Sequence, residues 1–219
     1  MPLPRLAGGE KRGGRRGGAS VREGTPVRDQ LLGTTQPLLS ISLEAGESVV
    51  AAAGGFAWMT DSIEMAACDG SPKGPLALCV YTATDAAGAV GFAPNLPGSI
   101  LGLDLSHSGY LVHRSSFLAG TPDVQFVADQ GDGIRLSRLT GSGRAWIALP
   151  GDVITRELSG GESLRVRPRH IGMVDASVAI QVAEVQGIAD GSPYLCAVLS
   201  GPGTVWLQSM PAGVDEATE

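Results

Sequence analysis

The stretch LPGSILGLDL, which runs from Leu96 to Leu105, returns as LPGDVITREL from Leu149 to Leu158. The likeness continues beyond both copies at the same offset of 53 residues, so that Leu111 matches Leu164. A third and weaker copy begins upstream with LLSISL (Leu38–Leu43). A chain repeats a segment in this way when one supersecondary unit cannot bury its own hydrophobic face and needs its neighbours. The sequence therefore predicts three degenerate β-repeats.

Apolar residues alternate with polar ones at a period of two, which is typical of strands with one buried face. The clearest strands are LLSISL, ALCVYTAT (Ala77–Thr84), SVAIQVAEV (Ser177–Val185) and TVWLQS (Thr204–Ser209). Clusters of glycine, aspartate and proline lie between such segments and recur every eight to fifteen residues or so, which is typical of an all-β sandwich or barrel. Only SSFLAG (Ser115–Gly120) favours a short helical turn.

The C-terminus resembles the opening of the third repeat. GTVWLQSMPAG matches GRAWIALPG (Gly143–Gly151), with Trp206 at the place of Trp146. Because the first repeat lacks such an opening strand, we expect the last strand to pair beside the first repeat and close the sheet. Closure removes the exposed edges that invite aggregation. Trp206 is then the inward side chain of that strand, and its neighbours Val205 and Leu207 face the other side.

The sequence predicts a basic N-terminal arm, a folded domain and a short acidic tail. Residues 1–28 hold seven basic and two acidic groups, whereas the rest holds nine basic and twenty acidic groups. This Gly/Arg-rich arm has few apolar residues to offset the entropy of ordering, so we expect it to be disordered. Its alternative role is weak contact with anionic lipid or nucleic acid. A single all-β domain follows over residues 29–211, and a flexible acidic tail over 212–219.

Signatures of catalysis and metal binding are missing from the sequence. The three cysteines form no CxxC pair, and they indicate reduced thiols in a cytosol. There is no GxSxG nucleophile elbow, phosphate loop, secretory signal or long apolar run. The histidines, at positions 107, 113 and 170, lack the convergent spacing of a cupin metal site. We expect no catalytic residue, no cofactor and no metal.

One run of basic residues is a candidate binding site. In SLRVRPRH, Arg165, Arg167 and Arg169 alternate along an expected strand, while Leu164 and Val166 face the opposite side. Three guanidinium groups would then line one sheet face about 6–7 Å apart. This makes them a candidate anion-binding site for phosphate, lipid headgroups or a carboxylate-bearing partner. A solvated strand face, with some arginines bridging to nearby carboxylates, is the reading that we favour.

Several of these segments also carry a family resemblance. SVVAAAGGFAWMTDSIEM, FAPNLPGSILGLDL, FLAGTPDVQF, RLTGSGRAWIALPGDVITREL and LSGPGTVWLQS resemble the altered-inheritance-of-mitochondria protein 24 family, in order, from about Arg28 to Met210. The resemblance implies an all-β fold of the double-stranded β-helix class, like that of tryptophan RNA-binding attenuation proteins. The family's eukaryotic member serves mitochondrial inner-membrane organisation. The segment AACDGSPKGPLALCVYTA is abbreviated relative to longer members of the family.

We therefore expect a non-enzymatic structural or interaction protein, scaffold-like, in a bacterial cytosol, with membrane association as the alternative location. Homo-oligomerisation follows from the resemblance and from uncharged strands such as SVVAAAGGFAWM. The rival function is an anionic-ligand, lipid or RNA-binding module that uses the arginine strand. A cupin-type metal enzyme is the least favoured reading.

Overall fold

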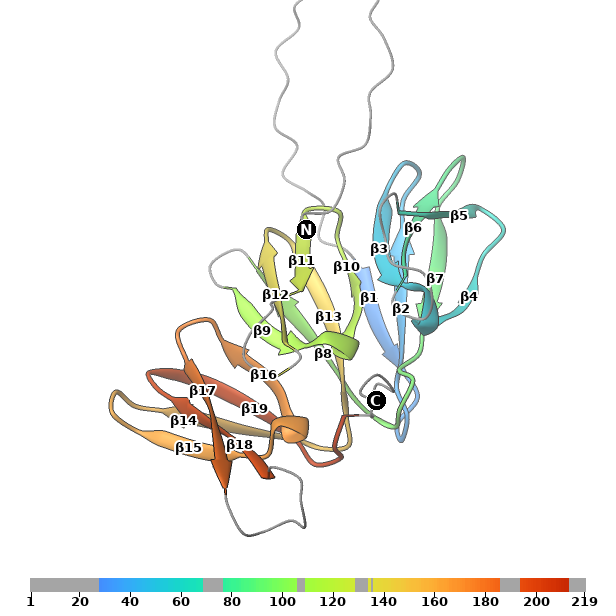
Figure 1. Ribbon diagram of the computed structural model, residues 1–219. Coiled ribbons are helices and arrows are strands. Elements are labelled where there is room, and N and C mark those ends of the chain that lie inside the picture. The colour runs from blue at the N-terminus through green and yellow to red at the C-terminus, as the bar shows by residue number, and fades with distance from the viewer. Residues whose placement is uncertain are drawn as a thin grey trace, which may run out of the picture.

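The structure is a computed structural model that describes residues 28–68, 77–105, 109–128, 134, 136–185 and 194–212. Their regular elements are strands and three short 3-10 helices (Figure 1), which confirms the predicted all-β class. No helix in these ranges is long and apolar enough to cross a membrane. The predicted arm up to residue 27 and the tail from residue 213 lie outside the described residues.

After β1 (Arg28–Leu32), three successive groups of elements follow one order: six strands, with a 3-10 helix between the second and third strands. We call them the first, second and third units. The first unit contains β2 (Leu38–Leu43), β3 (Ser48–Ala52), η1 (Ala53–Gly55), β4 (Phe56–Met59), β5 (Ile63–Ala67), β6 (Leu78–Ala83) and β7 (Gly88–Phe92). The second contains β8 (Gly98–Asp104), β9 (Tyr110–His113), η2 (Arg114–Ser116), β10 (Phe117–Gly120), β11 (Val124–Ala128), β12 (Leu136–Gly141) and β13 (Arg144–Pro150). The third contains β14 (Val153–Leu158), β15 (Ser163–Val166), η3 (Pro168–His170), β16 (Ile171–Asp175), β17 (Ala179–Val185), β18 (Tyr194–Ser200) and β19 (Gly203–Gln208).

Strand pairing follows one scheme in every unit. The first and third strands pair with the sixth, and the second and fourth pair with the fifth, all antiparallel. Neighbouring units are joined where the second strand of one pairs with the third strand of the next, as β3 does with β10 and β9 with β16. Each unit therefore divides its strands between two sheets.

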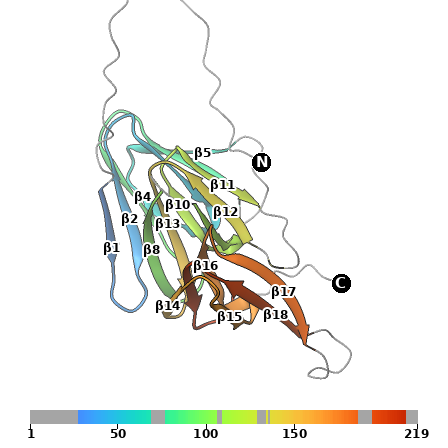
Figure 2. The same ribbon diagram turned by 90° about the vertical axis from the view of Figure 1, so that its left-hand side faces the viewer.

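This division produces four sheets. Two have six strands, in the orders β5-β6-β3-β10-β13-β8 and β11-β12-β9-β16-β19-β14, and each holds half of one unit and half of the next. At the start of the chain stands the half-sheet β2-β7-β4, with β1 added beside β2, and at its end stands the half-sheet β15-β18-β17. We call these the first and last half-sheets. In Figure 2 the strands of the first two units run beside one another, and those of the third unit lie below them.

Apolar side chains between successive sheets form three cores. The first core combines residues of the first unit with Leu118, Ala119 and Trp146 of the second. The second core likewise takes Met173 and Trp206 from the third unit. A third core lies mainly within the third unit, against the last half-sheet. Each unit thus completes the core of the unit before it, which is the physical reason why one unit alone would not suffice.

Each of the three tryptophans belongs to the same kind of strand pair, although Trp58 is on the third strand of its unit and the other two are on the sixth. In each unit the third strand has a β-bulge opposite the sixth strand, and just after the bulge one large side chain lies beside its partner. A Cβ atom on Gly91 would overlap the Trp58 indole, so the small residue there makes room for the large one. The bulge pairs are Trp58–Gly91, Ala119–Trp146 and Met173–Trp206.

The polar turns that begin the first and third units share their chemistry. Gly46 and Gly161 adopt the left-handed backbone, with φ of 84° and 86°. The glutamate that follows each glycine folds back, so that its Oε2 accepts a hydrogen bond from the backbone N–H three residues earlier, at 2.8 Å in both turns. A glycine followed by a glutamate therefore sets the geometry of both turns.

The predicted pairing of the last strand is wrong. β19 does not pair beside the first unit, because it lies between β14 and β16 of its own unit. The sixth strand of the first unit is β7, in which Gly91 holds the place of the expected tryptophan. Ser115–Gly120 splits into the end of η2 and the strand β10. The described strands form sheets in linear order, and no closed barrel is found among them, so the closed sandwich or barrel stays a prediction.

The alternation along β19 is as expected, but both of its faces are covered. Val205 is fully buried in the third core, and Leu207 packs against that core. Trp206 is half-buried in the second core, where its ring meets Tyr110 edge-on at 5.9 Å.

Candidate functional site

The predicted arginine array does not form on one strand face. β15 ends at Val166, and Pro168 opens the 3-10 helix η3, because proline has a fixed φ and no N–H to continue the ladder. Arg165 is exposed on the strand, and Arg167 is the exposed residue that caps η3. Arg169 lies within η3, where its Nε and Nη2 donate to the backbone oxygen of Ala212 at 3.0 and 2.8 Å.

Two of the three guanidinium groups therefore remain open to an anion. The Arg167 guanidinium lies over the ring of Tyr194, 5.7 Å from the ring centre, a contact that orients its planar group. No ion pair joins Arg165 or Arg167 to a carboxylate within the described ranges, so bridging to nearby acids is not seen there. Arg165 belongs to the edge of the last half-sheet.

The two described histidines serve the fold. His113 is buried, and its Nδ1 lies 2.9 Å from the hydroxyl of Ser115, at the start of η2. His170 lies in η3 with its Nδ1 2.9 Å from the backbone oxygen of Gln208. His107 lies outside the described residues. Among the residues that the structure describes, no group of three or more His, Cys, Asp or Glu side chains is placed to hold a metal ion.

One polar contact was not foreseen from the sequence. Asp29 on β1 accepts a hydrogen bond from Nε1 of the buried Trp146 at 3.0 Å, and its carboxylate lies 3.3 Å from Nη2 of Arg144. The Arg144 guanidinium also lies over the Trp146 ring, 5.8 Å from its centre. More than a hundred residues separate these partners, so no local pattern could have revealed them. They fasten β1 to the second unit.

A small cavity lies where the first and second units meet. Its volume is about 20 Å³, room for about one water molecule. It is lined by the ends of β3 and η1, by the Ala93–Asn95 linker and by η2 and β10. A space of this size holds no organic substrate.

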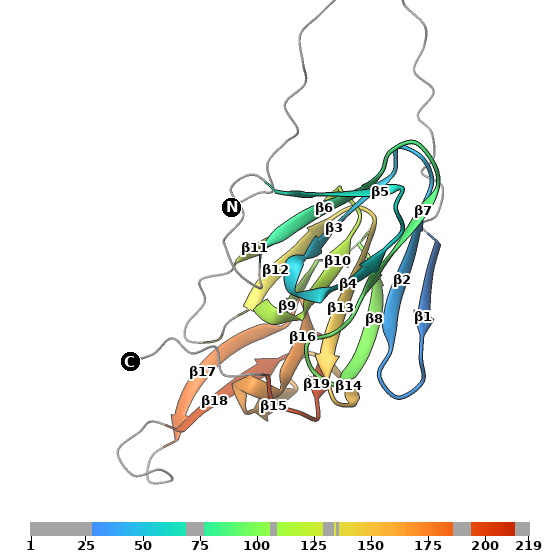
Figure 3. The ribbon, with the colours of Figure 1, turned by 90° about the vertical axis from the view of Figure 1, so that its right-hand side faces the viewer.

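The strand edges at the two ends of the chain offer larger surfaces. Among the described strands β4 pairs only with β7, and β15 pairs only with β18. Phe56 and Met59 on β4 are 37% and 38% exposed, and the Trp58 ring between them is half-buried. Figure 3 shows β4 on the outside of the first unit, away from β15.

The fold and these surfaces define an all-β protein of serial six-stranded units, in which the side chains of Asp29, Arg169 and His170 hold segments of the fold together. The family described as Mitochondrial biogenesis AIM24 matches residues 30–210, and the chain belongs to that family. This confirms the resemblance drawn from the sequence motifs.

A solved structure has the same fold. The chain is similar to the protein SPYM3_0169 from Streptococcus pyogenes, with a TM-score of 0.71 and 18% sequence identity. The match covers 84% of this chain and 94% of the streptococcal one. A comparison with curated proteins gives no match.

Proposed function

We propose that this protein is a non-enzymatic structural protein that works by binding other proteins through its sheets, in the cytosol of a bacterium. In this proposal its three units are degenerate copies of one β-module of the double-stranded β-helix type. The observation that carries it is the pair of half-sheets, whose edge strands β4 and β15 each pair with one strand among those described. Such an edge is a template for pairing with another chain.

The engagement of the polar side chains supports the same proposal. Asp29, Arg169 and His170 bind partners that belong to other strands or to the C-terminal segment, and so they hold the fold together. Because these side chains already have hydrogen-bond partners within the fold, their role is structural.

A second candidate function rests on Arg165 and Arg167. Both are exposed, neither has an ion-pair partner among the described residues, and Tyr194 orients one of them. The pair suits a phosphate, a lipid headgroup or RNA. The variant Arg165→Ala/Arg167→Ala separates this function from the structural one.

The experiment combines metal analysis of the purified chain with binding to vesicles of anionic phosphatidylglycerol and to single-stranded RNA at increasing salt. The structural proposal expects no stoichiometric metal and no salt-sensitive binding that depends on the two arginines. Binding that is lost in the double alanine variant favours the anion-binding module. Stoichiometric bound metal, with metal-dependent turnover, would overturn the structural proposal.

A further inference from the structure

The two ends of the chain carry complementary halves of one sheet. Each six-stranded sheet consists of the fourth, fifth and second strands of one unit joined to the third, sixth and first strands of the next. The last half-sheet is the former half, in the order β17-β18-β15, and the first half-sheet is the latter, in the order β4-β7-β2. Joined through β15 and β4, they would repeat the order of both internal sheets.

We propose that the last half-sheet of one molecule pairs with the first half-sheet of a second copy of this chain, β15 against β4, in a head-to-tail assembly. This rests on the proposed structural function and names its partner. Figure 1 places β4 and β15 on opposite sides of the molecule, and Figures 2 and 3 show β15 well below β4, so a chain does not supply both edges of its own junction.

The strand pairs that join neighbouring units within the chain, β3 with β10 and β9 with β16, predict the register of the proposed β15–β4 junction. The residue before the cap of the 3-10 helix pairs with the residue just after the bulge, as Ala51 does with Ala119 and Val112 does with Met173. The equivalent residues at the open ends are Val166, which precedes the cap Arg167, and Trp58. Antiparallel pairing then sets Met59 opposite Arg165.

The half-buried Trp58 indole indicates which surface of the first unit a second copy would cover in the assembly. Trp146 and Trp206, from the equivalent bulge pairs, each enter the core of the preceding unit. Trp58 is the tryptophan of the first unit, before which the described residues contain no other unit, and it stays half-buried. The third core lacks a following unit and is bounded by partly buried side chains, including Leu164 and Ile180. In the assembly the indole of one copy would complete the third core of the other.

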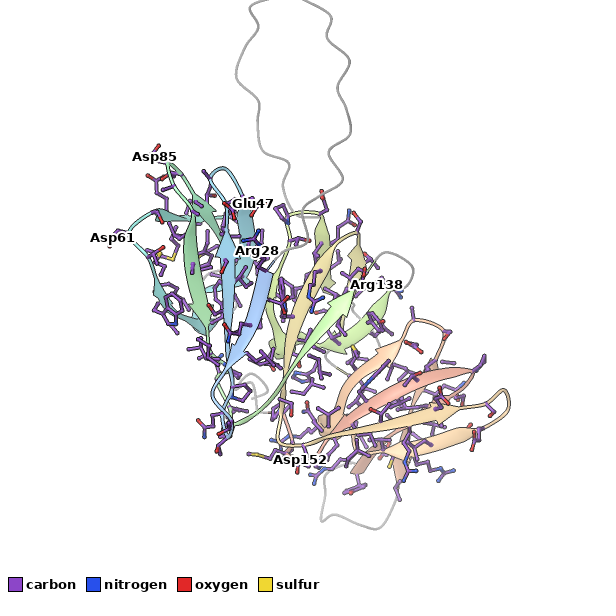
Figure 4. All side chains as sticks on the ribbon, turned by 180° about the vertical axis from the view of Figure 1, so that it is seen from behind. Arg28, Glu47, Asp61, Asp85, Arg138 and Asp152 are labelled. Carbon is purple, nitrogen blue, oxygen red and sulfur yellow. The ribbon has the colours of Figure 1, made fainter. Side chains whose placement is uncertain are left out.

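Charge also favours this pairing. The β15 edge carries Arg165 and is followed by Arg167, both exposed. The first unit carries exposed acids at its outer end, including Asp61 two residues after β4 and Asp85, both labelled in Figure 4. In the proposed register Asp61 is diagonal to Arg165, about 7–8 Å away along the sheet, which is within the reach of an arginine side chain.

A head-to-tail contact uses two different surfaces, so it differs from a two-fold dimer in a testable way. Met59→Cys and Arg165→Cys are made separately, each in a chain with Cys68→Ser and Cys196→Ser, since Cys79 is buried. Opposed residues in antiparallel strands lie within disulfide range. Co-expression of the two variants followed by mild oxidation is expected to give a cross-linked band at twice the chain mass of 22.4 kDa.

Each variant alone is the matched control, and it should give no such band. Arg165→Cys with Ile154→Cys, which is 46% exposed on β14, should give none either. A band of equal strength from either variant alone indicates a two-fold contact and overturns the proposal. Failure of the mixed pair to cross-link also overturns it, yet leaves the structural function standing if another protein occupies the edge.

Trp58→Ala should weaken assembly roughly 30-fold or more, as removal of a central interface tryptophan does. The control Met65→Ala, at a side chain 51% exposed on β5, should leave assembly unchanged. If Trp58→Ala fails to fold, the exposed Arg165→Glu tests the same junction, because it sets like charges against each other. Adding Asp61→Arg to that chain should restore assembly. Unchanged assembly in both Trp58→Ala and Arg165→Glu would refute the junction.

Discussion

Trp146→Ala should be the most damaging single tryptophan replacement. The Trp146 side chain is 1% exposed and lies in the first core, so its removal leaves a cavity that costs about 3–5 kcal/mol. The lost hydrogen bond to Asp29 adds about 1 kcal/mol. This cost is small for a lost hydrogen bond because the Asp29 side chain is 19% exposed and retains its ion pair with Arg144. Trp206→Ala, at a half-buried ring, should cost only about 2 kcal/mol.

Urea unfolding followed by far-UV circular dichroism measures this difference without relying on the fluorescence that the variants lose. With a denaturant slope of about 2 kcal/mol per molar, Trp146→Ala should lower the urea midpoint by about 2–3 M. Trp146→Phe keeps most of the packing and should cost about 1–2 kcal/mol, which makes it the matched control. A midpoint for Trp146→Ala within experimental error of the wild type, or below it by less than for Trp206→Ala, would refute the assignment of the cores.

Three further changes test other parts of the structure. Deleting residues 1–32 removes β1 and should lower the melting temperature by several degrees relative to deletion of 1–27, which keeps the Asp29 contact. Burial raises the pKa of Tyr81 to about 12, so the unfolded chain releases this proton first, and stability should fall by about 1.4 kcal/mol per pH unit between about pH 10 and 12. Tyr81→Phe should flatten that dependence and stabilise the fold at neutral pH, because the buried hydroxyl has no partner among the described residues; an unchanged pH profile would contradict this. Gly91→Ala should displace the indole beside it and cost about 1–3 kcal/mol, whereas Gly160→Ala, with open space around it, should be neutral in the same melting assay.

The strands themselves were accessible to sequence reasoning because their pattern is local. Leu38–Leu43 was predicted as a strand and is β2, and the predicted TVWLQS strand is β19 displaced by one residue. Alternation of apolar and polar residues reports directly on the two faces of a sheet. The repeated sequence likewise marks elements that recur in the same order.

The pairing partners were not accessible, and the tryptophans show why. The bulge pair needs one large side chain, but that side chain comes from the sixth strand in the second and third units and from the third strand in the first. A comparison along the sequence therefore found no counterpart of Trp146 in the first unit and assigned the last strand to it. The two paired positions share one space in the core, so the large side chain that fills this space can come from either strand.

The arginine site was overestimated for a similar reason. Alternation along SLRVRPRH predicted three guanidinium groups on one face, but Pro168 ends the strand and turns Arg169 toward the C-terminal segment. Proline is visible in the sequence, and it was the signal that could have limited the array to Arg165 and Arg167. The contact of Asp29 with Trp146 left no such signal.

The mass of the intact wild-type protein in solution tests the central claim most directly. Light scattering behind size exclusion, at micromolar concentration and again at about 1 M salt, should report a whole multiple of the 22.4 kDa chain mass, because apolar sheet contacts are not screened as charges are. A mass that grows with concentration indicates an open head-to-tail filament, and a single discrete mass indicates a closed assembly, which is either a head-to-tail ring or a two-fold dimer. The cysteine pairs at positions 59 and 165 distinguish the ring from the dimer. A mass of 22.4 kDa under both conditions would contradict the claim that a second copy completes the two half-sheets.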